Sequence, residues 1–343
     1  MQYAFKALSR LQYIKIDKNT TMKNAILFGN GLNLLNGGIS WNDLLEKISS
    51  EPLIKKIPNT LQYETIVLAS EKYYNESFIF NAGSLLLTNG SPLYTKKPIE
   101  EDIKNKIKDE LKNFTSNFAY QRLSELNVEQ YITTNYDQTL YNLLCKKGYK
   151  KGESNNTESI YSIRRRFGLI NKSGTCKYIW PIHGTIQHPK SIMLGLDHYC
   201  GSIGKINDYL KGDYNYTKNG KTFTLDKITS RLKEQKCEIP FSWIDLFFTH
   251  NIHIIGLGLQ YDEIDLWWIL NRRQRYIKQF GKENTISNKI HFYGNTSNSM
   301  KKLLNKFGVE VYTFRQKGLK PNDPLYYEVQ YNYYIDKITS FCK

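Results

Sequence analysis

The hexapeptide at residues 132–137, Ile-Thr-Thr-Asn-Tyr-Asp, gathers polar groups directly after a short apolar run. It carries two hydroxyls, the amide of Asn135, the ring of Tyr136 and the carboxylate of Asp137. Because ligands bind at the carboxyl ends of the strands in an open α/β sheet, these groups are placed to meet one. Asp137 can also accept amide hydrogen bonds at the start of a helix predicted for residues 138–145. Taken alone, the stretch is read equally well as an ordinary strand-to-helix turn.

A second stretch, residues 178–184, is an apolar run that ends in His183-Gly184. Histidine changes its charge near neutral pH, which suits it to the role of a general base. A histidine in such a place is more often structural, so His183 gains weight only together with other groups.

Two glycine-rich turns complete the set of candidate groups. Gly29-Asn30-Gly31 and the nearby Asn33 follow the apolar run 25–28, and Gly256-Leu257-Gly258-Leu259 follows the run 252–255. Glycines let backbone amides approach a phosphate closely, and a following helix adds positive potential. The complete dinucleotide fingerprint is absent, because Leu34 stands where its third glycine would be.

These turns require parallel strands to bring them together. The continuous apolar run at residues 25–28 indicates a strand buried on both faces, and we predict further strands at residues 178–182, 192–195, 252–255, 289–293 and 309–314, besides the one before Asn135. Helical patterns alternate with them. The sequence therefore predicts an α/β fold with a doubly wound, mainly parallel, Rossmann-like sheet.

The remaining segments are predicted to decorate this sheet. Residues 1–21 form an N-terminal arm or a leading strand, and residues 22–343 form the ligand-binding domain. Apolar positions at helical spacing predict a helical insertion at about residues 51–126. A polar, glycine-containing stretch predicts a smaller insertion at about residues 200–240.

Composition limits the partners and the setting. The 48 basic and 32 acidic residues give a net charge of +16; this fits either an anionic partner or merely solvated lysines. The densest basic cluster, 164–166, is expected on a solvated face. Five widely spaced cysteines without a CxxC pair argue against a disulfide framework and a zinc ribbon. The chain has no long apolar run and no signal peptide, so we expect a cytoplasmic protein without a membrane span.

In this order and spacing the motifs resemble the sirtuin family, especially its bacterial sirtuin-like NAD-hydrolase branch of anti-phage defence. The family's Gly-Ala-Gly turn is matched by residues 29–31, its Thr-Gln-Asn-x-Asp by 133–137, its His-Gly by 183–184 and its late Gly-x-Ser/Gly-Leu by 256–259. Its Gly-Ile-Pro is matched loosely by residues 38–40, and the resemblance covers about residues 22–315. The four-cysteine zinc module of deacetylating sirtuins and the Phe-Arg of their cofactor loop are missing. Both departures count against protein deacetylation and favour water as the acceptor.

The resemblance implies a role for each candidate residue. Asn135 would orient the ribose or the attacking water, His183 would act as base or hold a ribose hydroxyl, and Asp137 would organise the nicotinamide side. The phosphates and the nearby ribose would be contacted by Gly29, Asn30, Gly31 and Asn33, and the adenosine half by Gly256, Gly258 and Leu259. Thr134 and Tyr136 are further candidates for cofactor contacts. NAD would be the substrate, and we expect no metal.

The function expected from the resemblance is that of an NAD glycohydrolase acting as a toxic effector of abortive anti-phage defence. Its expected partners are NAD+, further copies of the chain in a homo-oligomer, and a separate regulatory protein of a defence operon; nucleic acid would be met only through such a partner. Three alternatives stay open: a non-catalytic NAD or ADP-ribose sensor, a sirtuin-type protein deacylase, and a nucleic-acid-binding protein driven by the positive charge. The sequence also leaves open whether the product is ADP-ribose or a cyclised form.

Overall fold

The computed structural model describes residues 22–71, 99–155, 158, 160–218, 220–233, 240–280, 286–315, 318 and 323–343. The arm or strand predicted for residues 1–21 lies outside these ranges. No helix among the described residues combines the length and the apolar character needed to cross a membrane.

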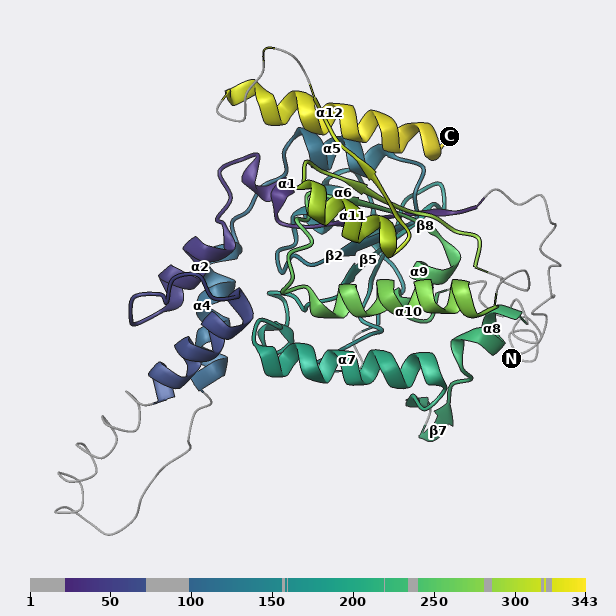
Figure 1. The fold of residues 1–343 in the computed structure, drawn as a ribbon, viewed down its shortest axis with the longest axis horizontal. Coiled ribbons are helices and arrows are strands. Elements are labelled where there is room, and N and C mark those ends of the chain that lie inside the picture. The colour runs from purple at the N-terminus through teal and green to yellow at the C-terminus, as the bar shows by residue number, and fades with distance from the viewer. Residues whose placement is uncertain are drawn as a thin grey trace, which may run out of the picture.

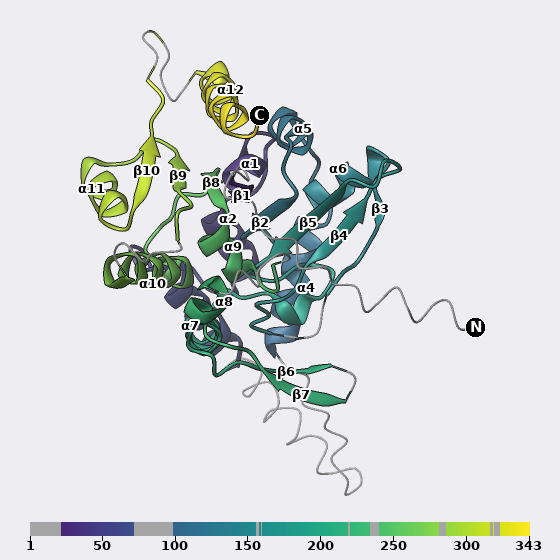
Figure 2. The same ribbon diagram turned by 90° about the vertical axis from the view of Figure 1, so that its right-hand side faces the viewer.

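An eight-stranded sheet with the order β10-β9-β8-β1-β2-β5-β4-β3 forms the centre of the molecule (Figures 1 and 2). Its strands are β1 (Asn24–Phe28), β2 (Gln130–Thr133), β3 (Lys150–Lys151), β4 (Phe167–Ile170), β5 (Cys176–Pro181), β8 (Asn251–Ile255), β9 (Ile290–Tyr293) and β10 (Val309–Tyr312). All neighbours from β10 to β5 pair in parallel, whereas β4 is antiparallel to both β5 and β3. The prediction of a mainly parallel sheet is confirmed.

The order of the six parallel strands, β5-β2-β1-β8-β9-β10, is consistent with a Rossmann-like fold. From β1 the chain moves outward through β2 to β5, and then returns to add β8, β9 and β10 on the other side. The order therefore reverses between β1 and β8, which is the switch point at which such folds bind ligands.

Helices cover both faces of the sheet, and a central strand such as β1 is apolar on both of its faces for that reason. Ala25 and Leu27 face the core beneath α7 (Leu196–Lys211), α9 (Trp243–Thr249), α10 (Ile264–Phe280) and α11 (Asn298–Lys306). Ile26 and Phe28 face the core beneath α5 (Phe118–Glu125), α6 (Thr139–Lys146) and α12 (Pro324–Phe341). Figure 2 shows these two sets of helices on opposite sides of the strands.

A third apolar core lies beside the carboxyl ends of the strands. It is built by α2 (Trp41–Ile48), the helical residues 59–71 and α4 (Ile99–Leu111), which we call the helical layer. Ser40 caps α2 by accepting a hydrogen bond from the amide of Asp43. Compared with the insertion expected at residues 51–126, the helical layer starts earlier, at α2, while α5 belongs to the sheet, because Tyr120 and Leu123 pack beneath α12. Figure 1 shows α2 and α4 at one side of the sheet.

The stretch 200–240 is more regular than the polar excursion expected from its composition. Most of α7 lies within it and buries Ile206, Tyr209 and Leu210 in the sheet core. A hairpin of β6 (Asn215–Lys218) and β7 (Lys221–Thr224) and the short α8 (Ile228–Lys233) follow. Residues 192–195, predicted as a strand, form no strand; the 3-10 turn η1 (Pro189–Ser191) leads through them into α7.

Candidate functional site

The two glycine turns meet at the switch point of the sheet. The amide of Gly31, the first residue of the short α1 (Gly31–Leu34), donates to the carbonyl of Gly256 at 2.8 Å. A Cβ on Gly31 would lie 2.7 Å from that same oxygen, and one on Gly29 would lie 2.8 Å from the Leu257 side chain. These glycines are therefore needed for close packing of the two turns. The Gly31 amide is already donated within the protein, so in this arrangement it is not directed at a phosphate.

The adenosine-side residues continue this turn. Gly256 has a φ of 65° and Leu259 a φ of 44°, so the chain turns sharply twice after β8. The Leu259 side chain is buried, whereas Gly258 is exposed. A hollow of about 880 Å³ opens next to them, lined among others by Gln260, Asp262 and residues 51–59, which connect α2 to the next helix of the helical layer. Its volume is that of a small-molecule pocket.

A chain of amides and a carboxylate links the turns after β1 and β2. The Asn33 side-chain nitrogen donates to Oδ2 of Asp137 at 2.8 Å and to Oδ1 of Asn30 at 3.0 Å. Asn30 in turn donates to the carbonyl of Ile39. Oδ1 of Asp137 accepts the amide of Thr139 at 2.9 Å, so the predicted capping of α6 by this carboxylate is present. The structure thus brings together residues that are more than 100 positions apart in the sequence.

Asn135 joins this network through a tyrosine that sequence reasoning did not single out. The hydroxyl of Tyr120 on α5 donates to Oδ1 of Asn33 at 2.7 Å and accepts from Nδ2 of Asn135 at 3.3 Å. Tyr120 is fully buried, and burial, reinforced by the charge of Asp137, raises its pKa well above the usual range. The phenol therefore stays neutral and keeps its proton for Asn33. Oδ1 of Asn135 is buried and has no hydrogen-bond partner among the described residues.

The free face of Asn135 borders a small cavity. Its volume of about 10 Å³ holds one water molecule at most. The floor is formed by the polar turns, with Asn30, Asn135 and Asp137, and the roof by apolar side chains of the helical layer and the segments beside it: Ile39, Trp41, Leu44, Leu111 and Phe114. The helical layer therefore closes over Asn135.

Thr134 and Tyr136 flank Asn135 and are tied into the protein. The Thr134 amide donates to the carbonyl of Phe28, which continues the pairing of β1 with β2. The Tyr136 hydroxyl donates to the carbonyl of Met193 at 2.5 Å, and its ring contacts that of Trp41 at 5.2 Å between centroids. Tyr136 thus connects the turn after β2 to Trp41 in the roof of the cavity.

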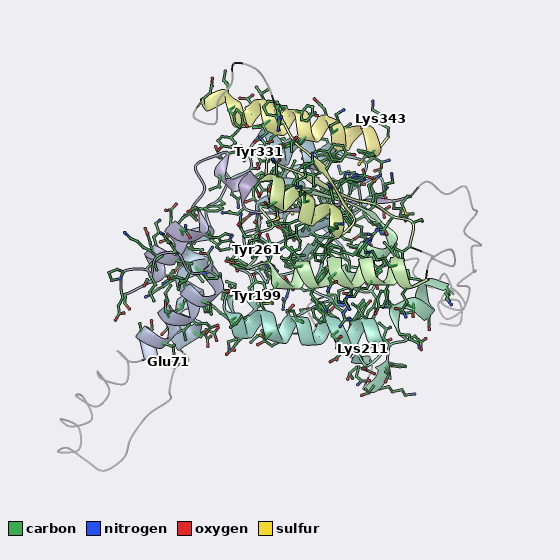
Figure 3. The ribbon with its side chains drawn as sticks, in the orientation of Figure 1. Glu71, Tyr199, Lys211, Tyr261, Tyr331 and Lys343 are labelled. Carbon is green, nitrogen blue, oxygen red and sulfur yellow. The ribbon has the colours of Figure 1, made fainter. Side chains whose placement is uncertain are left out.

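His183 lies two residues beyond the end of β5 and is buried, with 2% of its side chain exposed. Its Nε2 lies 3.0 Å from Oδ2 of Asp265 at the start of α10, and its Nδ1 lies 3.7 Å from Oε2 of Glu263. The Tyr199 hydroxyl is 3.4 Å from the same Nδ1. Figure 3 shows Tyr199 at the end of α7 nearest the helical layer. The ring of His183 is thus held between two carboxylates.

The electrostatics of this group follow from burial and from its two acids. Burial alone would lower the pKa of His183, but the charge and hydrogen bond of Asp265, together with Glu263, outweigh it and raise that pKa. Burial raises the pKa of Glu263 to about 7; His183 opposes this change, and Asp265 and Asp262 add to it. The two acids therefore favour the charged form of His183, and burial brings the pKa of Glu263 to about 7.

Among the described residues, His183, Glu263 and Asp265 are the one set of three side chains whose potential metal-binding atoms lie within 4.8 Å of one another. The two carboxylates face opposite nitrogens of one ring, whereas an ion would bond to one nitrogen only. The arrangement therefore fits hydrogen bonding better than metal binding. The expectation that no metal binds stays a prediction.

The structure thus forms two polar groups at the carboxyl edge of the sheet, one around Asn135 and one around His183. Glu263, Asp265 and Tyr120 were missed, since acids in the first turn of a helix and a tyrosine in an apolar stripe are common structural features. The solvated face expected for residues 164–166 is contradicted: Arg165 and Arg166 are buried, and Arg164 stacks on the ring of Phe241. They stabilise the loop before β4.

Comparison of the chain with protein-family models and with curated proteins gives no match. The resemblance to sirtuin-like NAD hydrolases therefore rests on the motifs alone, and function has to be argued from the geometry.

Proposed function

We propose that the chain is an NAD glycohydrolase that cleaves NAD+ to nicotinamide and ADP-ribose. The observation that carries the proposal is Oδ1 of Asn135, a buried acceptor without a partner among the described residues, in a side chain that lines a water-sized cavity. Buried polar groups are almost always hydrogen-bonded, so a vacant one next to a cavity points to a ligand or a reactive water. The motif resemblance supports NAD as that ligand.

Cleavage of NAD+ requires a group that holds the attacking water and negative charge near the reacting sugar, and the polar groups around Asn135 and His183 can supply both. The glycosidic bond breaks through an oxocarbenium-like state, as in glycoside hydrolysis, and the bond electrons leave with the neutral nicotinamide. Asn135, oriented by Tyr120, would accept a hydrogen bond from the attacking water or a ribose hydroxyl. Asp137 supplies negative charge near the developing cation. The hollow beside Gln260 and Asp262 is our candidate for the adenosine half.

The same geometry supports an enzyme that is held off until it is needed. Apolar side chains of the helical layer roof the Asn135 cavity, so NAD reaches Asn135 only when that layer moves. Uncontrolled loss of NAD kills a cell, and a closed resting form suits a toxic effector of anti-phage defence. We propose that this effector acts in the cytoplasm and that assembly into a homo-oligomer or a separate regulatory protein opens the site.

The test is NAD consumption by the purified protein, with the products identified by chromatography. Nicotinamide and ADP-ribose should accumulate with the wild type but not with Asn135→Ala or His183→Ala. The circular dichroism spectra of both variants should match that of the wild type, which shows that they are folded. Asn305→Ala and His188→Ala, which change exposed residues of the same types, are the matched controls and should hydrolyse NAD normally.

Full hydrolysis by both site variants would refute the assignment of the site. Tight NAD binding by the wild type without turnover, even after the assembled form has been isolated, would favour the sensor instead. Absence of both binding and turnover would remove the proposal.

A further inference from the structure

Glu263 stands out because it is the most accessible member of the His183 group. The exposed fraction of its side chain is 14%, against 2% for His183 and 0% for Asp265. Its Oε2 is itself buried, lies 3.7 Å from Nδ1 of His183 and has no hydrogen-bond partner among the described residues, so the exposed part is the rest of the side chain. A substrate in front of this group would therefore meet the Glu263 carboxylate before it met the imidazole.

Both ring nitrogens of His183 face polar groups of the protein. Nε2 faces Asp265, whose Oδ1 is fixed in turn by the amide of Leu266 at 2.8 Å, and Nδ1 faces Glu263 and Tyr199. A base needs a free lone pair, and an imidazole that is charged carries protons on both nitrogens and has none. His183 is thus better suited to supply a fixed positive charge than to remove a proton.

We propose that Glu263 is the general base of the site and that His183, held by Asp265, is the charged positioning residue that keeps Glu263 ionised and aimed. This inference rests on the proposed NAD hydrolysis and names the residue that takes the proton in it. Without the imidazolium, a carboxyl group at this depth would be neutral and unable to accept a proton.

The step balances in atoms and charge. The water oxygen bonds to the ribose carbon as the bond from that carbon to the nicotinamide nitrogen breaks, and the nitrogen keeps the electron pair. One proton of the water passes to the carboxylate of Glu263, which later releases it to solvent. The net change is NAD+ and water to nicotinamide, ADP-ribose and a proton.

Other titratable groups face Glu263 from three elements. Asp262 and Asp265 flank it in the chain, Tyr136 comes from the turn after β2, and Tyr199 comes from α7. Burial, the largest cause, and the nearby acids raise the pKa of both tyrosines well above the usual range, so they stay neutral. A base whose pKa lies near that of the medium works efficiently, which fits the pKa of about 7 for Glu263.

The experiment combines turnover with nitrogen NMR of histidine-labelled protein, using wild type, Glu263→Gln and Asp265→Asn. Glu263→Gln keeps the shape of the side chain and should lower kcat by at least about 100-fold with little change in KM. In the wild type, both His183 nitrogens should carry protons at neutral pH. Removing either acid should lower the pKa of His183 by about one unit or more. Glu129→Gln, at an exposed carboxylate, is the control for both measurements.

Two results would overturn the proposal: a neutral His183 at pH 7 in the wild type, or a Glu263→Gln variant that hydrolyses NAD at the wild-type rate. The NMR titration uses the free protein, so it remains decisive even if the wild type consumes no NAD. In that case the proposed function fails, while the charged state of His183 between its two acids stands or falls by the titration alone.

Discussion

The Tyr120 hydroxyl donates to Oδ1 of Asn33 at 2.7 Å and so ties α5 to the turn after β1. The same oxygen accepts from Nδ2 of Asn135. An amide side chain has a nitrogen that donates and an oxygen that accepts hydrogen bonds. In Asn135, the bond to Tyr120 uses the nitrogen. It leaves the side-chain oxygen of Asn135, a residue that lines the cavity, without a partner among the described residues. The side-chain orientation of Asn135 is thus fixed by a hydrogen bond to Tyr120 on α5.

Tyr120→Phe should therefore reduce NAD hydrolysis and destabilise the fold together. Two buried groups, on Asn33 and Asn135, lose their partner, which costs about 1–3 kcal/mol of unfolding free energy. Urea unfolding and turnover per folded molecule measure the two effects. Tyr131→Phe is the matched control, because it removes a buried phenol that bonds to Leu123 and Lys177 away from the site. It should lose stability and keep turnover; equal turnover in both variants would contradict the role of Tyr120.

The same glycine-to-alanine change should have opposite effects at two places. In Gly31→Ala the new Cβ would lie 2.7 Å from the Gly256 carbonyl and 2.8 Å from the Tyr331 hydroxyl, so we expect a loss of about 1–3 kcal/mol. Gly204 lies exposed within α7, with no atom within 4 Å of an added Cβ. Gly204→Ala should stabilise the protein by about 0.5–1 kcal/mol, because alanine is the better helix former. Thermal unfolding of both variants gives the sign.

The central strands could be predicted from sequence because each one is apolar on both faces. The run Ala25–Phe28 has no polar residue and Ile252–Ile255 has only His253, which is typical of a parallel sheet between two layers of helices. The turns after them were found because their residue types are unusual for an apolar context. The prediction of a strand at residues 192–195 was wrong, because a short apolar run can equally be a buried connection between other elements.

Other features left no local signal. α12 mixes tyrosines with polar residues and has no clear apolar stripe, so the segment gave no helix prediction, although it buries Tyr334, Ile335 and Ile338. The pairing of His183 with Asp265 joins residues 82 positions apart, and Asp265 on its own fits a favourable charge at a helix start. Sequence shows which groups are available; the fold decides which of them meet.

Breaking the buried ion pair between Arg231 and Asp245 should lower the free energy of unfolding far more than breaking an exposed ion pair. Arg231 donates to Asp245 at 2.9 Å, and Tyr209 donates to the other oxygen of this carboxylate. Asp245→Ala leaves a buried positive charge, and we expect a loss of about 3–5 kcal/mol. Asp109→Ala removes the exposed pair with Lys112, which solvent screens, and should leave the urea midpoint almost unchanged. Urea titration of both compares them; similar losses would contradict the role of burial.

Acid should weaken the amino-terminal end of the sheet through two histidines. Burial lowers the pKa of His250 to about 4 and, with the neighbouring His291, that of His253 to about 3, from an ordinary value of 6.5. Between these values the unfolded chain binds more protons, so stability falls as the pH drops below about 6.5. Each group contributes about 2 kcal/mol of loss by pH 5. Glu263 opposes this trend, since its raised pKa favours the fold as the pH falls from 7.

The difference between wild type and His253→Asn isolates the histidine effect from that of Glu263. Urea midpoints at pH 7.5 and pH 5 should move less in the variant than in the wild type. An equal movement would show that the neutral state of His253 does not contribute to acid sensitivity.

Trp41→Ala should raise NAD turnover while it lowers stability, if the helical layer keeps the site closed. The Trp41 ring roofs the Asn135 cavity and contacts Tyr136, so its removal widens the cavity and loosens the layer. Ile66→Ala is the matched control: Ile66 is buried in the same core but does not line the cavity. Each variant should lose about 2–5 kcal/mol of stability. Higher turnover in Trp41→Ala alone means that the roof limits access of NAD to Asn135. Higher turnover in both would mean that general loosening opens the site, and a decrease in both would remove the layer as a lid.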